Sequence, residues 1–197
     1  MPLIRQTLFA AALALAWMPA AADEAAEARA LATAERLVDG AHGALVDPGL
    51  SEAARADQLR ETVAAAFAFD IWERFLLGDR ASALSDAQKG EFRDRLPGFL
   101  AHLYANQFGK GLEEKPEIRD ARPARSDTLV RASIPRANGK ALPVDWRVRD
   151  FDGRGALVID VMVGGISFLV LKREEFASIL DDKGPDGLLA FMADNSL

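Results

Sequence analysis

The sequence of 197 residues contains no cysteine. An exported chain of this composition would carry no disulfides, which suits a bacterial periplasm better than a disulfide-stapled extracellular module. No cysteine stands near residue 22 either, and this excludes lipoprotein anchoring. Histidine is scarce: His42 and His102 show no H-x-x-x-H or H-E-x-x-H spacing. We therefore expect both to be ordinary helix-surface residues, and we expect no metal site.

Long apolar runs are also scarce. Residues 8–18 form a continuous apolar stretch, which is about half of the ~20 residues needed to cross a bilayer. With Arg5 before it and an A-x-A pattern at 20–22, this stretch predicts a signal peptide over residues 1–22, cleaved after Ala22. We therefore expect export to the periplasm and a soluble mature product.

Positive charge is in deficit, with 24 Lys and Arg against 30 Asp and Glu and a net charge of −6. A mildly acidic chain without a basic stripe is a poor candidate for binding nucleic acid. Patterns of the G-x-S-x-G, Walker A and G-x-G-x-x-G kinds are absent. Residues 23–197 have the length of one ordinary domain and show no internal repeat. We expect a single domain with no cofactor and, by default, a monomer.

The N-terminal half has helical spacing. Apolar residues recur at intervals of three, four and seven over residues 24–45, so one face of this segment is apolar. Asp70 has the position of an N-cap for a short apolar helix over residues 71–77. The clearest helix begins at the capping box S-D-A-Q over residues 85–88, and Pro97-Gly98 predicts a kink or break inside it.

The C-terminal half changes to a period of two. Residues 128–134 and 142–149 are strand candidates. In the second of these, alternation places one set of residues on a single face, namely Leu142, Val144, Trp146 and Val148. Hairpin signals at Asn138-Gly139 and Asp152-Gly153 favour an antiparallel meander.

Residues 156–163 are apolar on both faces except for Asp160, which predicts a central strand. Two helices over residues 174–180 and 185–192 close the chain. Helices followed by a meander indicate an α+β domain with N-terminal helices packed on an antiparallel sheet. Asp160 itself needs hydrogen-bond partners or a raised pKa. It fits a general base in an apolar pocket, but a structural acid that faces a loop or an arginine is the favoured interpretation.

Six short motifs occur in a fixed order along nearly all of the mature chain. They are F-A-F-D at 67–70 running on to L-G at 77–78, L-S-D-A-Q at 84–88, P-V-D-W-R-V at 143–148, D-V-M-V-G-G-I-S at 160–167, F-A-S-I at 176–179 and G-L-L at 187–189. In this order and spacing they resemble the MlaC family, also called the toluene-tolerance family, from about residue 31 to residue 192. The chain departs from the family pattern at Ala156, where a Trp is usual, and at residues 169–172, where a Tyr-Arg pair is usual.

The resemblance implies a fold like that of nuclear transport factor 2, in which helices and a curved antiparallel sheet enclose a cone-shaped apolar cavity. It also implies a periplasmic phospholipid-binding protein that serves as an auxiliary component of an ABC transporter. Such a protein shuttles glycerophospholipid between an outer-membrane lipoprotein–porin complex and an inner-membrane Mce-type ABC transporter complex, and so maintains outer-membrane lipid asymmetry. A hopanoid-linked lipid carrier is the alternative cargo class.

Eight apolar residues are predicted to line the cavity and bind lipid. They are Trp72, Phe75, Phe99, Leu103, Val144, Trp146, Val158 and Met162. Periodicity predicts their burial but does not distinguish a solid core from a hollow one. Two other functions stay open: an enzyme acting on an apolar substrate in the same pocket, with Asp160 as acid or base, and an adaptor with a solid core. The enzyme lacks a second polar partner in the sequence, so we expect no enzymatic activity.

Overall fold

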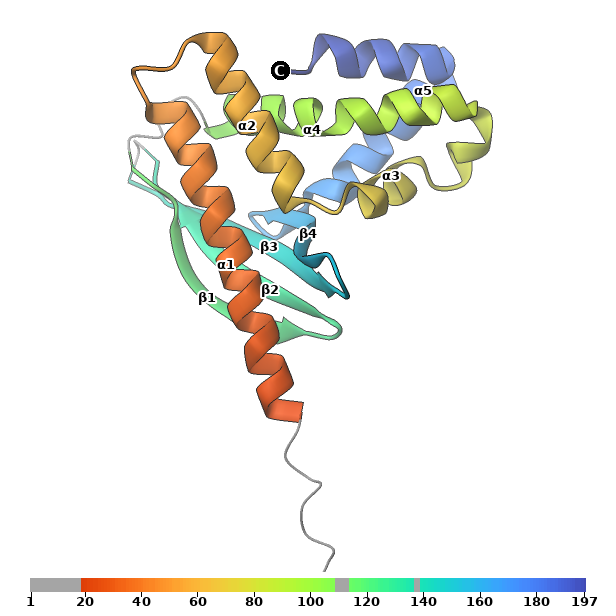
Figure 1. The fold of residues 1–197 in the computed structure, drawn as a ribbon. Helices are drawn as coiled ribbons and strands as arrows, with labels where there is room; N and C mark the ends of the chain where they lie inside the picture. Colours follow the sequence, from red (N-terminus) through yellow and green to blue (C-terminus); the bar gives the residue numbers. More distant parts are fainter. Residues whose placement is uncertain (1–18, 109–113, 137–138) are drawn as a thin grey trace, which may run out of the picture.

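The computed structural model describes residues 19–108, 114–136 and 139–197, so most of the predicted signal peptide lies outside it. Within these ranges no helix combines the length and the hydropathy of a membrane span. Helices come first along the chain and a meander of strands follows (Figure 1). The elements are α1 (Pro19–Val46), α2 (Glu52–Ala66), α3 (Phe69–Leu77), the 3-10 helix η1 (Gly78–Ala83), α4 (Asp86–Phe108), β1 (Glu117–Ala124), β2 (Asp127–Ile134), β3 (Leu142–Phe151), β4 (Gly155–Val163), β5 (Ile166–Ser167) and α5 (Phe168–Asp194).

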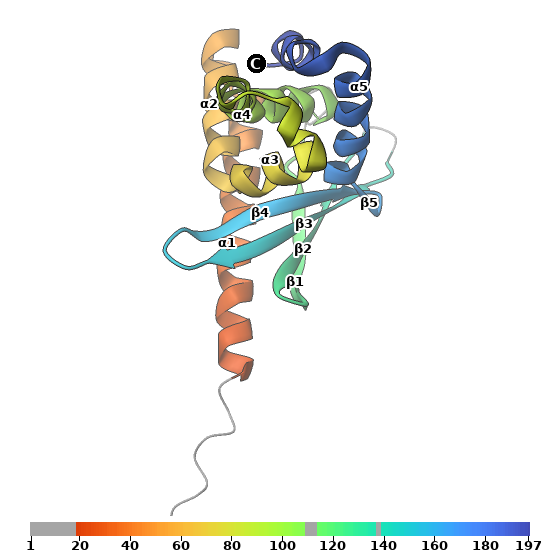
Figure 2. The same ribbon diagram turned by 90° about the vertical axis from the view of Figure 1, so that its right-hand side faces the viewer.

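The five strands form one antiparallel sheet in the order β1-β2-β3-β4-β5. Helices α2 to α5 lie together on one side of this sheet, and α1 runs across it and beyond its edge (Figure 2). α1 contacts β1, β2, β3 and β4, so a single helix supports all four longer strands. The predicted α+β fold is confirmed.

α4 begins at the predicted capping box. The Ser85 hydroxyl accepts from the Gln88 amide at 3.3 Å, and the Gln88 side-chain oxygen accepts from the Ser85 amide at 2.9 Å. The break expected near Pro97 is absent, because α4 continues as one helix to Phe108. Gly98 instead allows a close approach of the C-terminal residues to α4. A Cβ at this position would lie 2.3 Å from the Ser196 hydroxyl oxygen. The Gly98 carbonyl accepts from the Leu197 amide at 3.2 Å.

The two predicted closing helices are two segments of α5. They meet at Gly184, whose φ of 68° and ψ of −175° are not helical, and Pro185 opens the second segment. The first segment begins earlier than predicted, at Phe168, where Ser167 caps it by accepting from the Val170 amide at 3.1 Å. The change of direction at Gly184 lets the second segment turn back along α4 (Figure 2).

The sheet order places β4 between β3 and β5, so β4 is an interior strand. It pairs with β3 along its length, whereas its other side carries only the two-residue β5 and an isolated bridge between Phe67 and Val158. β4 is rich in apolar residues because α1, α3 and α5 all pack against it. The predicted turn at Asp152-Gly153 joins β3 to β4 as expected, whereas Asn138 lies outside the described residues.

The hydrophobic core lies between the sheet and the helices. Val144, Trp146 and Val148 of β3 are at most 2% exposed, which confirms the face predicted from alternation. On the helical side, the Phe92 and Phe99 rings of α4 meet the Phe176 ring of α5, with centroids 5.9 and 5.4 Å apart. This packing fixes α4 and α5 over the sheet and leaves a hollow between the layers.

Candidate functional site

An apolar cavity of about 390 Å³ occupies that hollow. Its floor is the helix-facing side of the sheet: Ile134 of β2, Val144 and Trp146 of β3, and Val161 and Val163 of β4. Val144 pairs with Val163 and Trp146 pairs with Val161 across the two strands. Paired residues point to the same face, so the register alone assembles this apolar floor.

The roof of the cavity comes from three helices. α4 contributes Leu100, Leu103 and Tyr104, while Leu37 of α1 and Val63 of α2 close the sides. Residues three and four apart share one face of a helix, which is why Leu100, Leu103 and Tyr104 all face the hollow. Burial raises the pKa of Tyr104 to about 12, so its phenol is neutral at physiological pH.

The rim of the cavity, defined here as Ile166, Phe168, Leu171 and Lys172, follows the turn between β4 and β5. Ile166 and Leu171 are 59% and 54% exposed, which is unusual for large apolar side chains that also line a cavity. The turn before the rim is Gly164-Gly165, with φ values of 60° and 84° that favour glycine at both positions. A glycine turn thus precedes a largely apolar, partly exposed rim.

The Asp160 carboxylate is hydrogen-bonded to the segment that carries the rim. The carboxylate accepts from the Val161 amide at 2.8 Å, from the Ser167 hydroxyl at 2.8 Å and from the Leu169 amide at 3.3 Å. Burial raises the pKa of Asp160, while these hydrogen bonds and the positive charge of Arg147 oppose the rise. Asp160 pairs with Arg147 across the strands and is not among the cavity-lining residues. Its contacts are those of a structural acid that fastens β5 and the start of α5 to β4.

Three of the eight residues predicted to bind lipid line the cavity, namely Leu103, Val144 and Trp146. Trp72 lies one layer behind: its ring centroid is 5.4 Å from Phe67 and 6.4 Å from Phe168, both of which line the cavity.

The other four predicted residues lie elsewhere. Phe99 belongs to the aromatic packing between α4 and α5, and Phe75 lies 5.0 Å beneath the Arg173 guanidinium. Val158 is fully buried, and Met162 pairs with Asp145 on the face of the sheet opposite to the cavity floor. The structure brings three of the eight to the cavity wall, and direct contact of the set with lipid stays a prediction.

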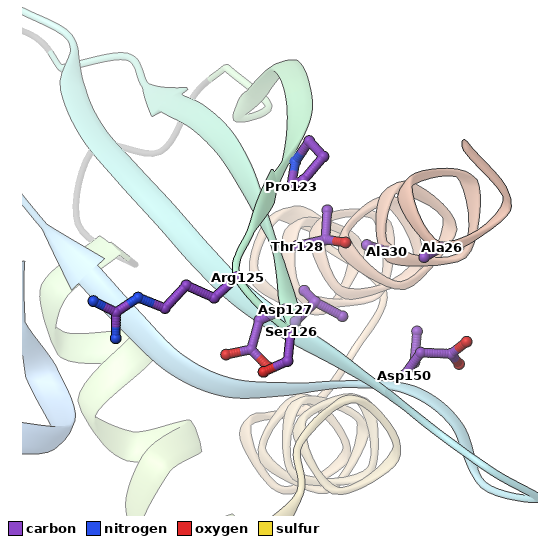
Figure 3. A pocket seen from close by; sticks show the side chains of 10 residues that line it. Ala26, Ala30, Pro123, Arg125, Ser126, Asp127, Thr128 and Asp150 are labelled. Atoms are coloured by element: carbon purple, nitrogen blue, oxygen red, sulfur yellow. The ribbon is translucent and has the colours of Figure 1, made fainter. Parts of the chain in front are cut away.

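A second, smaller cavity of about 140 Å³ lies between α1 and the β1–β2 hairpin (Figure 3). Two of its carboxylates are already paired: Asp127 accepts from Arg149 at 2.7 Å, and Asp150 accepts from Arg29 at 2.8 Å. The Arg125 side chain extends away from α1 in Figure 3. Across the described ranges, no group of three or more His, Cys, Asp or Glu residues could hold a metal ion. The smaller cavity is therefore a weaker candidate for a functional site than the apolar cavity.

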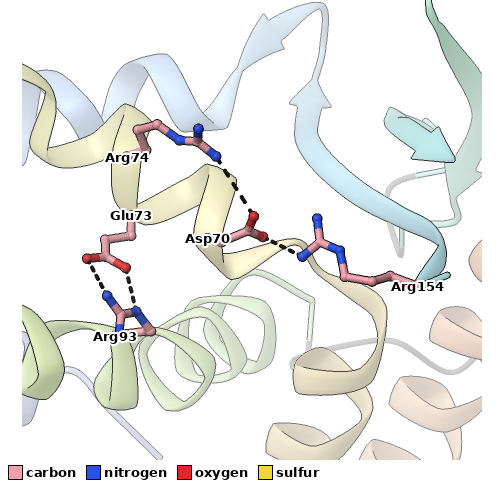
Figure 4. Close-up of polar contacts among 5 residues, drawn as sticks. All are labelled: Asp70, Glu73, Arg74, Arg93 and Arg154. Carbon is pink, nitrogen blue, oxygen red and sulfur yellow. Dashed lines mark hydrogen bonds and ion pairs between the residues drawn. The ribbon is translucent and has the colours of Figure 1, made fainter. Parts of the chain in front are cut away.

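Asp70 does not cap α3 as predicted, because the N-cap is Ala68 and no side chain caps this helix. Asp70 instead accepts from Arg154 at 3.0 Å, and this hydrogen bond lowers its pKa (Figure 4). Glu73 of the same helix accepts twice from Arg93 of α4, at 2.6 and 2.9 Å. α3 is thus tied both to the β3–β4 turn and to the helix that roofs the cavity.

Comparison with known proteins gives a family and a fold. The family model described as MlaC protein matches residues 35–194. Seven chains of solved structures match; one is a phospholipid-binding protein from Ralstonia solanacearum, solved in complex with a phospholipid. The two chains are 19% identical with a TM-score of 0.69, and the alignment covers 86% of this chain and 96% of that one. A comparison with curated proteins finds no match.

Proposed function

Because this chain belongs to the MlaC family, we propose that it is a phospholipid carrier that holds acyl tails in the cavity between sheet and helices. The observation that carries the proposal is the cavity itself, about 390 Å³ in volume and apolar except for Tyr104 and Lys172. The bound phospholipid of the Ralstonia solanacearum protein, which shares the fold, supports the same class of ligand. The cargo is a ligand that is handed on, and no cofactor is required.

Burial of acyl chains supplies the affinity. Each buried methylene contributes about 0.8 kcal/mol, so a handful of methylenes already gives firm retention. A volume of about 390 Å³ lies near the lower end of the roughly 300–1,000 Å³ that encloses drug-sized ligands. A diacyl phospholipid is larger than such ligands, so the cavity has to widen to accept two tails. Release then depends on a partner that favours a different conformation.

We further propose that the carrier works in the periplasm as a monomer. There it would shuttle glycerophospholipid between an outer-membrane lipoprotein–porin complex and an inner-membrane Mce-type ABC transporter complex, and so maintain outer-membrane lipid asymmetry. The signal-peptide pattern over residues 1–22 and the family membership support this placement. Carriage is favoured over catalysis because Asp160, the acid considered for an enzyme, does not line the cavity.

Native mass spectrometry of the mature protein, expressed with its own signal sequence, tests the proposal. We expect a complex whose excess mass corresponds to one glycerophospholipid, released as intact lipid on denaturation. A bare polypeptide mass would favour an adaptor with a solid core, and a released hopanoid would replace the phospholipid as cargo. Cleavage after Ala22 is read from the same spectrum.

A further inference from the structure

The lining of the cavity contains a single charge. Among the described residues that line it, Lys172 alone is charged, and the other polar residue, Tyr104, is neutral because burial raises its pKa to about 12. A cation is costly beside apolar surface unless it finds water or an anion. Lys172 is therefore the position on the lining where a polar or anionic group of a ligand can be accommodated.

Lys172 lies at the rim and not at the floor. It follows Leu171, which is 54% exposed, while the Lys172 side chain itself is only 17% exposed. Its ammonium lies 5.4 Å from the centroid of the Phe168 ring and 5.8 Å from that of the Phe99 ring. The ammonium thus lies within cation–π distance of two aromatic rings, one of which, Phe168, belongs to the rim of the cavity.

Glu175 is the acidic partner of Lys172 in the structure. The ammonium donates to the Glu175 carboxylate at 2.5 Å, one turn along α5, and the Glu175 side chain is 39% exposed. Because the Glu175 side chain is partly exposed, its carboxylate can rotate into water and leave the ammonium. A lysine ammonium also has three donors, so a second anion can bind beside Glu175 or replace it.

We propose that Lys172 binds the phosphate of the cargo lipid and makes the carrier select phospholipids over uncharged lipids with the same tails. In a glycerophospholipid the phosphate is joined to the acyl esters through one glycerol unit, so tails in the cavity bring the phosphate to the rim. Diacylglycerols and hopanoids offer only hydroxyl groups at that position. A charge-assisted hydrogen bond is about twice as strong as a neutral one, which gives the selection its physical basis. This inference rests on the proposed function.

The test is a competition for the cavity between two lipids with the same tails, one with a phosphoglycerol headgroup and one with a free hydroxyl. The mature protein is equilibrated with vesicles of equal parts dioleoylphosphatidylglycerol and dioleoylglycerol in phosphatidylcholine, and the lipids bound to it are counted by mass spectrometry. Wild-type protein should hold phosphatidylglycerol in excess. Lys172→Met, which keeps an apolar side chain of similar length, should reduce the ratio of the two lipids by about 10- to 150-fold. Lys172→Arg should restore it.

Two controls and two further outcomes complete the test. Glu175→Gln removes the competing carboxylate and should raise the ratio of phosphatidylglycerol to dioleoylglycerol. A large molar excess of glycerol 3-phosphate should leave the ratio unchanged; loss of selection would mean that Lys172 takes soluble phosphate, and the proposal would fall. Equal ratios in wild type and Lys172→Met would also overturn it. Wild-type protein that holds neither lipid would instead count against the proposed function, so the two failures are distinguishable.

Discussion

Asp160 shows how one side chain can support the rim without touching the cavity. Three donors converge on its carboxylate, from Val161, Ser167 and Leu169, and two of these lie in the segment that forms the rim. Burial disfavours the charged form of this carboxyl and is the largest cause of its raised pKa. The residue that looks most reactive in the sequence therefore has a positioning task.

The raised pKa of Asp160 predicts a pH dependence of stability. A carboxyl whose pKa is higher in the folded chain binds its proton more tightly there, so its favourable contribution is full below the unfolded pKa of about 3.9 and is lost as pH rises through the folded pKa. Asp160→Asn does not titrate. Wild type should therefore lose stability relative to this variant as pH is raised above about 4, which urea unfolding at a series of pH values measures. Parallel pH profiles for the two proteins would contradict it.

Asp160→Ala tests the hydrogen bonds separately from the charge. It leaves the Val161 and Leu169 amides without this acceptor, and we expect a loss of about 1–3 kcal/mol in the free energy of unfolding. Because Asn retains a side-chain oxygen in the same place, Asp160→Asn should lose much less. Equal losses in the two variants would show that the hydrogen bonds do not hold the rim.

Gly98 is a second residue whose replacement should destabilise the fold. A Cβ at this position would lie 2.3 Å from the Ser196 hydroxyl oxygen and 2.9 Å from the Leu197 carbonyl oxygen. Gly98→Ala should therefore lower the unfolding free energy by about 1–3 kcal/mol, as overpacking does. Removing residues 196–197 should abolish that loss, which a double-mutant cycle by urea unfolding would measure. An undiminished loss in the shortened chain would place the strain elsewhere.

At the scale of elements, β4 separates the cavity from the open face of the sheet by alternation alone. Val163 lines the cavity, whereas its neighbour Met162 faces the other way. Both are partly exposed, so both should tolerate a larger side chain. Val163→Trp should fill the cavity and, at about 1–3 kcal/mol of overpacking, weaken lipid retention by about 5- to 150-fold. Met162→Trp is the matched control.

Lipid extracted per mole of purified protein is the measurement for this pair. Retention should fall for Val163→Trp and stay at the wild-type level for Met162→Trp. If both variants keep their lipid, the tails do not reach this part of the floor. If both lose it, the change acts through the strand and not through the cavity.

Strong local patterns made most elements predictable, and the exceptions have physical causes. The capping box at Ser85 and the alternation in β3 were sufficient to predict α4 and the core face of the sheet. β1 was not predicted because it is a charged edge strand that contains Pro123 and pairs only with β2. The apolar composition of β4 predicted an interior strand, but it did not predict that only the two-residue β5 continues the sheet beyond it.

The cavity was harder to predict than the fold. Leu103, Val144 and Trp146 have the same periodic signal as residues of the solid core, such as Phe99 and Val158. Periodicity records which face is turned inward, and both kinds of residue are turned inward. Phe168 and Lys172 were missed because they lie in a segment that the sequence patterns had not assigned to a helix.

At the scale of the whole molecule, folding and cargo should be coupled. A ligand that binds only the folded state stabilises it by about 2.7 kcal/mol when present at 100 times its Kd. For a domain of this size each kcal/mol corresponds to about 2–4 °C in Tm. Removal of lipid should therefore lower the Tm by about 5–11 °C, measured by calorimetry on loaded and delipidated protein. Identical transitions would mean that the tails are not held inside the fold.

Pro97 interrupts the internal hydrogen bonding of α4, the helix that roofs the cavity. Proline has no N–H, so α4 loses the hydrogen bond to the Arg93 carbonyl one turn before its cavity-lining residues. Pro97→Ala should raise stability, by up to about 3 kcal/mol from helix propensity, and slow the exchange of lipid between protein and vesicles. Unchanged exchange in a stabilised variant would contradict the link.

The floor, in contrast, is formed by β2, β3 and β4, whose residues are paired across the strands where they line the cavity. The two walls of the cavity therefore differ, because only the helical wall contains an element with a missing internal hydrogen bond. Tails of different length or unsaturation would be accommodated by bending α4, at an elastic cost that grows with the tail. Under the proposed function, the work of bending α4 would then distinguish one lipid from another in addition to the chemistry of the headgroup.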